Sequence, residues 1–347
     1  MQFWLNYEQV RRRERRAERI FGCILCNNLR MFPVLAVLLA ALLFGTTGTA
    51  QALADVDGSP MSIGAVRILL GGGILACVAL VTGSGRFAPR FSPGAPRPTP
   101  TDALARVPIW VIVLAGAIGV VAYQPTFFAG TRMNGVAVGT VIALGFAPIA
   151  TGVLDVFVRR RIPTKRWMLA TAIALIGVVL VSGLIGSASA AGVGPAGLLA
   201  SLAAGASYAV YALSSKLLLD RGWSPSGAMG AVFGGAAVLS IPLLFTGPLA
   251  WLFTPTGITL ALWLGIVTVA IAYLLFGWGL KRLSPTVVTT LTLGEPLSAT
   301  LLGILVLHEQ LTPIAMAGLA VIAVGLIVLS IPTRRVPTRK EPVDAPA

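Results

Sequence analysis

The most regular feature of the sequence is a series of long apolar stretches separated by short polar or charged segments. A helix needs about 20 mostly apolar residues to cross the roughly 30 Å of hydrocarbon in a bilayer. The pattern therefore predicts an all-α membrane protein with ten transmembrane helices. The ten predicted spans lie at about 32–53, 61–83, 107–124, 134–157, 167–186, 195–218, 228–247, 257–279, 286–306 and 312–331.

Polar segments flank and interrupt these spans. Residues 1–30 are rich in arginine, residues 87–108 between the second and third spans are rich in proline, and residues 332–347 form a charged tail. We interpret the first segment as a basic cytoplasmic segment and the last as a cytoplasmic tail. Three roles are open for the first segment: a signal for membrane orientation, a helix held against anionic lipid, or a leader before a start at Met31.

Lysine and arginine are distributed unevenly among the predicted loops. Of the 26 basic residues, 25 lie in loops or at span ends, and 24 of these fall on one face, with Arg132 alone on the other. Basic loop residues mark the cytoplasmic side. We therefore expect a multi-pass protein of the cell (inner or plasma) membrane with both termini in the cytoplasm. The net charge of +14 is then a feature of topology, and no nucleic-acid partner is needed to explain it.

Composition narrows the classes of function. Only 11% of the residues are charged, against about 25% in soluble proteins. One histidine and three cysteines are too few for a typical histidine–cysteine metal centre, so no metal or other cofactor is expected. The single His308 lies beside Glu309 without a second base or ligand, which disfavours a membrane-embedded enzyme. A non-transporting polytopic membrane protein remains an alternative.

The sequence contains a weak internal repeat. A shift of 148 positions places residues 136–182 on residues 284–330 without a gap, with Pro148 on Pro296 and Thr164 on Thr312. Each half, 32–186 and 195–331, holds five spans, so equivalent loops must lie on opposite faces. The loop after span four carries five basic residues and its equivalent after span nine carries none. Inverted repeats of this kind are typical of transporters that bind substrate between the two halves.

Two prolines at matched positions are candidates for helix breaks. A proline inside a helix removes one hydrogen bond and leaves the carbonyl four residues earlier without its donor. Pro148 and Pro296 would free the carbonyls of Leu144 and Thr292 in this way. Breaks in corresponding spans often mark a substrate site, although a packing kink without substrate contact is equally compatible.

Charged residues within the spans are the next candidates. Glu295 is the only acid near the middle of a span, and Arg67 is the only base inside one. Such residues usually face a cavity or a partner, because a charge in hydrocarbon is costly. Glu295 could carry a proton, or the two could simply form an ion pair. Asp155 is expected to form only a surface pair with Arg159, four residues later.

Uncharged polar residues complete the predicted pathway. Tyrosine hydroxyls and glutamine amides need partners in an apolar environment, so they are stronger candidates than serine or threonine, which often bond to their own helix. The candidates are Gln51, Tyr123, Gln124, Tyr208, Tyr211 and Thr292.

The chain resembles the EamA branch of the drug/metabolite transporter superfamily over about residues 32–331. The motif Leu-Gly-Glu-Pro-Leu at 293–297, followed by His-Glu-Gln-Leu-Thr at 308–312, is similar to the family pattern in the ninth span and the next loop. Leu-Phe-Gly at 43–45 and Arg67 also fit. The first half departs from the pattern, because Ala147 precedes Pro148 and Arg161 stands where Glu309 stands in the second half.

The resemblance implies ten helices in two inverted five-helix repeats around a central cavity, which opens alternately to each face. It also implies a small-molecule substrate, amino-acid-like or drug-like and often exported, and a protein that is a monomer or a homodimer. Some small relatives couple transport to protons through a glutamate in the first helix. The first span has no acid here, so Glu295 is the remaining candidate for proton coupling, and uncoupled transport is equally compatible.

Overall fold

The structure is a computed structural model that describes residues 31–83, 107–182, 194–308 and 312–331. Contacts divide the chain into residues 32–329 and a second unit formed by residues 1–31 and 330–347, and only the first is discussed below. The whole basic segment 1–30, most of the proline-rich segment, Glu309 and the charged tail lie outside the described residues.

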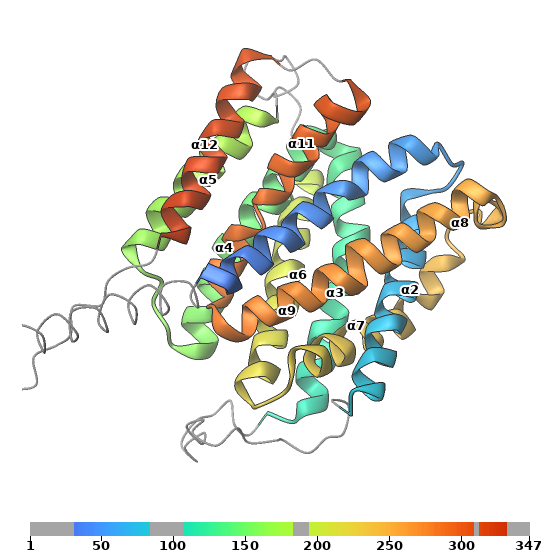
Figure 1. The fold of residues 1–347 in the computed structure, drawn as a ribbon, viewed down its shortest axis with the longest axis horizontal. Coiled ribbons are helices and arrows are strands. Elements are labelled where there is room, and N and C mark those ends of the chain that lie inside the picture. The colour runs from blue at the N-terminus through green and yellow to red at the C-terminus, as the bar shows by residue number, and fades with distance from the viewer. Residues whose placement is uncertain (1–30, 84–106, 183–193, 309–311, 332–347) are drawn as a thin grey trace, which may run out of the picture. The chain divides into compact units, whose positions relative to one another are not determined.

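Every regular element of the described residues is helical (Figure 1). The order of helices is Met31–Ala54, α2 Pro60–Val81, α3 Ile109–Asn134, α4 Val136–Arg159, α5 Lys165–Val181, α6 Pro195–Asp220, α7 Pro225–Leu244, the short η3 Ala250–Phe253, α8 Pro255–Leu262, the π-helical η4 Trp263–Ile271, α9 Ala272–Arg282, α10 Pro285–Leu291, α11 Gly294–Leu307 and α12 Pro313–Ser330.

Nine helical segments of the described chain are long and apolar enough to cross a membrane. Two of them combine shorter helices, since Pro255–Arg282 comprises α8, η4 and α9, and Pro285–Leu307 comprises α10 and α11. The predicted fifth span corresponds to α5, which has 17 residues. The nine segments confirm an all-helical membrane protein.

The third span is longer than the apolar pattern predicts. The predicted end at residue 124 is wrong, because α3 continues through Pro125 to Asn134. Gly135 then turns the chain directly into α4 with a φ of 84°, a backbone conformation that glycine adopts without steric cost. Gln124 and Arg132 are therefore helical residues and do not lie in a connecting loop.

The internal repeat recurs in local structure. Thr164 caps α5 by accepting a hydrogen bond from the Trp167 N–H, and Thr312 accepts in the same way from the Ala315 N–H. Arg160 and His308, also 148 positions apart, end their helices in the same left-handed conformation, with φ of 54° and 55°. Such agreement in helix caps is stronger support for a repeat than the low sequence identity alone.

Close helix contacts depend on glycine. A Cβ on Gly177 of α5 would lie 2.6 Å from the Ile322 nitrogen of α12, and one on Gly205 of α6 would lie 2.6 Å from the Ala143 carbonyl oxygen of α4. α5 and α12 accordingly lie side by side (Figure 1). Small residues allow such approaches between helices in membranes.

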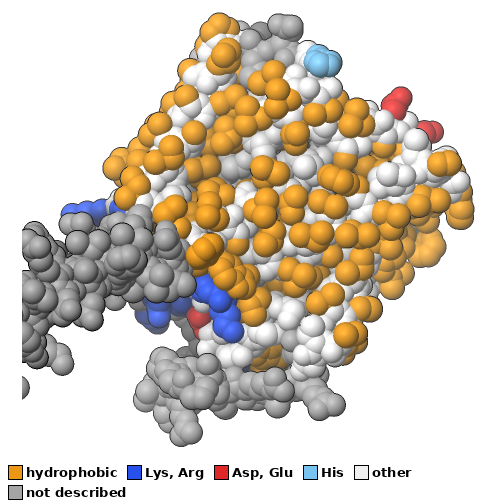
Figure 2. Space-filling view, in the orientation of Figure 1, with side chains coloured by type: hydrophobic (Ala, Val, Ile, Leu, Met, Phe, Trp, Pro, Cys, Tyr) orange, Lys and Arg blue, Asp and Glu red, His pale blue; other side chains and the backbone are white. Residues whose placement is uncertain are grey.

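Large apolar side chains are exposed on the outside of this helical unit, including Phe157 at 73% and Leu305 at 71%. On the face in Figure 2, apolar side chains cover the middle, lysine and arginine side chains gather toward one edge, and the histidine lies at the opposite edge. An apolar surface between polar edges is what a bilayer requires of a multi-pass protein.

Candidate functional site

The site begins at an interruption of the ninth span. α10 ends at Leu291 and α11 begins at Gly294, so Thr292 and Leu293 form a break, called the break below. The proline argument predicted a free carbonyl at Thr292, and this prediction is wrong. The Thr292 carbonyl oxygen accepts a hydrogen bond from the Glu295 N–H at 2.9 Å, because the chain tightens by one residue at this point.

The matched proline of the first half has a different effect. α4 runs without interruption through Pro148, so the expected break there is wrong. Phe146 and Ala147 stand where the second half has Gly294 and Glu295. Glycine favours a helix end far more than phenylalanine or alanine does, and this explains why only the second proline accompanies a break.

A hydrogen bond from α6 reaches the break. The hydroxyls of Tyr208 and Thr292 are 2.9 Å apart. Because Thr292 donates its only hydroxyl proton to the Thr289 carbonyl at 2.9 Å, Tyr208 is the donor in the bond with Thr292. This bond joins α6, the first span of the second half, to the break in the fourth span of the same half.

Tyr208 belongs to a group of four tyrosines, called the tyrosine cluster below, that comprises Tyr123, Tyr208, Tyr211 and Tyr273. Its ring centroids are 6.5 Å apart for Tyr123–Tyr208, 4.8 Å for Tyr208–Tyr211 and 6.0 Å for Tyr211–Tyr273. The hydroxyls of Tyr211 and Tyr273 share a hydrogen bond of 3.2 Å. The sequence has five tyrosines, and four of them converge here from α3, α6 and α9.

The sequence reasoning missed Tyr273 and Phe233, and it named Phe44 only as part of the Leu-Phe-Gly motif. The ring centroid of Tyr273 lies 4.0 Å from that of Phe233 in α7 and 5.0 Å from that of Phe44 in the Met31–Ala54 helix. The scarcity of tyrosine in the chain was the signal that could have pointed to it. A π-helical stretch directly precedes α9 and changes which side of the span faces inward, which no apolar pattern reveals.

Glu295 and Arg67 face the same region without forming an ion pair. Glu295 lies in the first turn of α11 and is partly buried, and Arg67 of α2 is close enough to act electrostatically on Glu295, Tyr123 and Tyr273. The charged groups of Arg67 and Glu295 are farther apart than the 4.0 Å of an ion pair. The buried Arg67 Nε has no hydrogen-bond partner among the residues that the structure describes.

The two glutamines occupy other places. The Gln51 amide nitrogen donates to the Thr47 carbonyl of its own helix at 3.2 Å. Gln124 is 7% exposed and packs on α2, where a Cβ on Gly64 would lie 2.8 Å from its Oε1 atom. Neither residue has a described hydrogen bond to the tyrosine cluster or to the break.

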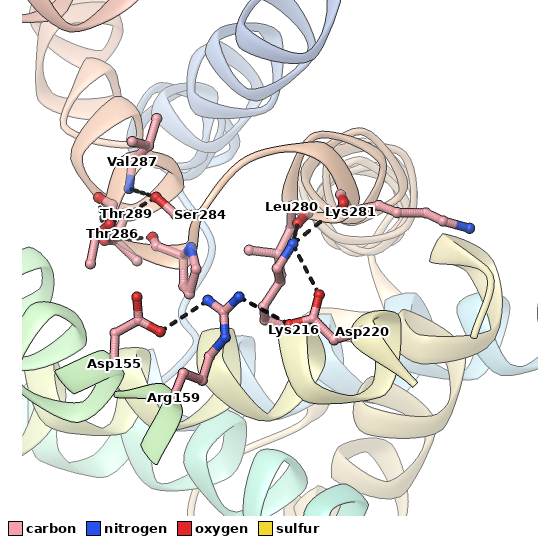
Figure 3. A network of polar contacts seen from close by, with 11 residues as sticks. Asp155, Arg159, Lys216, Asp220, Leu280, Lys281, Ser284, Thr286, Val287 and Thr289 are labelled. Carbon is pink, nitrogen blue, oxygen red and sulfur yellow. Dashed lines mark hydrogen bonds and ion pairs between the residues drawn. The ribbon is translucent and has the colours of Figure 1, made fainter. Parts of the chain in front are cut away.

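A second polar group, which we call the charge network, lies where α4, α6 and α9 end (Figure 3). Arg159 bridges Asp155 at 2.9 Å and Asp220 at 3.0 Å, and Lys216 pairs with Asp220 at 3.4 Å. The expected pair between Asp155 and Arg159 is confirmed, but its surface position is wrong, because Asp155 is only 3% exposed. The pair is drawn inward because Arg159 also reaches Asp220 of α6.

Lys216 extends the charge network to a third helix. Its ammonium group donates to the carbonyl oxygens of Leu280 at 2.8 Å and Lys281 at 3.3 Å, near the end of α9. A cation is favourable there because the last carbonyls of a helix have no partner within the helix. The charge network thus ties one helix of the first half to two of the second.

Comparison with known proteins gives consistent results. The EamA-like transporter family matches residues 31–183 and again residues 195–331. The chain is 36% identical over 301 residues to the "Uncharacterized transporter YwfM" of Bacillus subtilis (strain 168), covering 87% of this chain and 94% of that protein. It is 30% identical over 230 residues to "Protein PecM" of Dickeya dadantii (strain 3937), covering 64% and 73% of the two chains.

A solved crystal structure with 20% sequence identity has the same fold. It aligns with a TM-score of 0.66 and covers 85% of this chain and 95% of the other.

Proposed function

Because the chain belongs to the EamA-like transporter family, we propose that it is a secondary transporter that exports a small amino-acid-like or drug-like metabolite by alternating access. In this proposal it spans the cell membrane ten times, as inverted repeats 32–186 and 195–331, with both termini in the cytoplasm. The observation that carries the proposal is the break, with Thr292 bonded to Tyr208 and Glu295 two residues beyond it.

The substrate site lies between Glu295, Arg67 and the tyrosine cluster. Two opposite charges that do not pair with each other can each bind a ligand group, Glu295 an amine and Arg67 a carboxylate or another acceptor. Tyrosine faces favour a cationic or apolar part of the same molecule. The interrupted helix also brings the irregular backbone of Thr292 and Leu293 into this region, and broken helices form substrate sites in other transporters.

Alternating access also needs a closed side. The charge network lies at the ends of α4, α6 and α9, together with the basic loops that we place in the cytoplasm. We propose that it is the closed cytoplasmic gate of the outward-open or occluded state. Opening this gate would separate Arg159 of the first half from Asp220 of the second.

The proposal is tested by flux into proteoliposomes. Amino acids, sugars, nucleosides and cationic drugs are screened with and without a pH gradient, first by thermal shift and then by uptake.

We expect one class of amines or zwitterions to be transported and Glu295→Gln to abolish its flux while the protein still folds. Asp57→Asn, at an exposed acid, is the matched control and should transport normally. Wild-type flux in Glu295→Gln would refute the role of this carboxylate, and no flux of any class would refute the proposed transport of amino-acid-like or drug-like solutes.

A further inference from the structure

A shallow groove on the outer surface between α4 and α5 is separate from the proposed substrate site. It has a volume of about 390 Å³ and is lined almost entirely by apolar side chains. Pro163 of the connecting loop closes one end, and Ile149 and Leu175 lie at the other. The α4 side extends from residue 149 to residue 156, roughly 10 Å at the helical rise per residue.

Exposed positive charge lies at the loop end of this groove. Arg160, Arg161 and Lys165 are exposed, and none of the three makes an ion pair with another described residue. The two other basic residues of the loop are engaged, because Arg159 belongs to the charge network and Arg166 donates to the Val328 carbonyl of α12. Three free cations therefore remain beside an apolar channel that runs away from them along the helices.

We propose that the groove is a binding site for an anionic phospholipid of the bilayer, with an acyl chain along α4 and α5 and the phosphate on the three cations. The combination matches the two parts of such a lipid: an apolar groove within the hydrocarbon and positive charge at headgroup depth. Basic pockets at the ends of membrane helices bind anionic headgroups by this chemistry. A zwitterionic lipid would fill the groove equally well but gain little from the charges.

The floor of the groove connects the lipid to α10, the helix that precedes the break. Trp167 and Thr171 line it. The Trp167 indole nitrogen donates to the Thr286 carbonyl at 2.8 Å and to the Thr290 hydroxyl at 2.9 Å, and the Thr171 hydroxyl is 2.9 Å from the same Thr290 hydroxyl. A bound acyl chain would thus pack on the side chains that hold α10 in place, and it would stabilise α10 against α5.

The binding experiment uses the full-length protein purified from mixed vesicles of phosphatidylglycerol and phosphatidylcholine, with retained lipid counted by native mass spectrometry. Wild type should retain phosphatidylglycerol preferentially. The variant with Arg160→Gln, Arg161→Gln and Lys165→Gln should lose this preference by on the order of 100-fold at low salt, about fivefold for each cation. Lys165→Gln alone removes one of the three charges and is the smallest change that tests their role. Its control is Lys281→Gln, which removes the charge of an exposed lysine in α9, away from the groove.

A second variant tests the groove without changing charge. Ala172 is exposed and lines the groove, so Ala172→Trp should fill it and displace the bound lipid. Ala320→Trp, at an exposed alanine of α12 outside the groove, should retain the lipid. Both the charge variants and Ala172→Trp should also lose the increase in melting temperature that phosphatidylglycerol gives to wild type.

Several results would overturn the proposal. Equal retention of the two lipids by wild type, or no difference between Lys165→Gln and Lys281→Gln, would remove the role of the cations. Competition by soluble glycerol phosphate would show an anion site without an acyl chain. Conversion of a dimer to a monomer by Ala172→Trp, with lipid retention unchanged, would assign the groove to a second copy of the chain. None of these readouts depends on transport.

Discussion

Breaking the charge network is the most direct test of the proposed cytoplasmic gate. Asp155→Asn removes one carboxylate charge and keeps the shape of the side chain. In the structure, Arg159 bonds Asp155 at 2.9 Å, and their side chains are 7% and 4% exposed, respectively. Arg159 keeps its contact with Asp220 at 3.0 Å in the variant, but Asp220 is 42% exposed, so solvent screens that remaining pair.

The magnitude follows from this geometry. Removing one partner of a fully buried pair costs about 3–5 kcal/mol, because it leaves a charge without compensation. Since Asp220 still compensates Arg159 in part, we expect the closed state to lose about 1–3 kcal/mol relative to the open state. An equilibrium between the two states would then shift by about 5- to 150-fold toward opening.

Cysteine accessibility measures this shift. Thr286 lies near the charge network in Figure 3 and is 4% exposed, so Thr286→Cys in a background without other cysteines should label slowly. Adding Asp155→Asn should raise the labelling rate from the cytoplasmic side by the same factor, and adding Asp57→Asn should not. An unchanged rate in a folded Asp155→Asn protein would refute the gate. Equal increases at both faces would indicate general unfolding instead.

Three further predictions follow from the packing. Tyr208→Phe removes the hydrogen bond to the break, and we expect a loss of about 1 kcal/mol in thermal unfolding together with slower flux; full stability and full flux would contradict this bond. Gly205→Val places a Cβ against a backbone carbonyl of α4 and should cost about 1–3 kcal/mol, whereas Gly73→Val, with open space around its Cα, should cost little in the same melting assay. For topology, Thr256→Cys should label only from outside and Lys281→Cys only from inside, and the reverse labelling would invert the proposed orientation.

Much of the fold was predictable because its signals are local. The length of an apolar stretch reports a span, and the position of basic residues reports a face, whatever the neighbouring helices are. The repeat was predictable from a shift of 148 residues. The matching caps at Thr164 and Thr312 show why two halves with few identical residues can have the same helix boundaries. A cap is set by one or two residues, while the spans between caps only need to remain apolar.

The candidate site was predictable in part. Tyr208, Tyr211 and Thr292 do meet, and Glu295 does lie beside the break. The equal treatment of Pro148 and Pro296 failed because a proline alone does not interrupt a membrane helix. Gly294, two residues before Pro296, supplies the second condition, and the first half has a phenylalanine at the matching position.

The sequence by itself therefore determined the apolar spans, the distribution of charge between their ends and the family. Only the tertiary structure decided which polar residues meet. It brought Tyr273 to the tyrosine cluster, buried Asp155 beside Arg159, and left Gln51 bonded to its own helix. The physical reason is that burial and hydrogen bonding depend on which helices become neighbours and how each is rotated, and these depend on contacts between residues far apart in the chain.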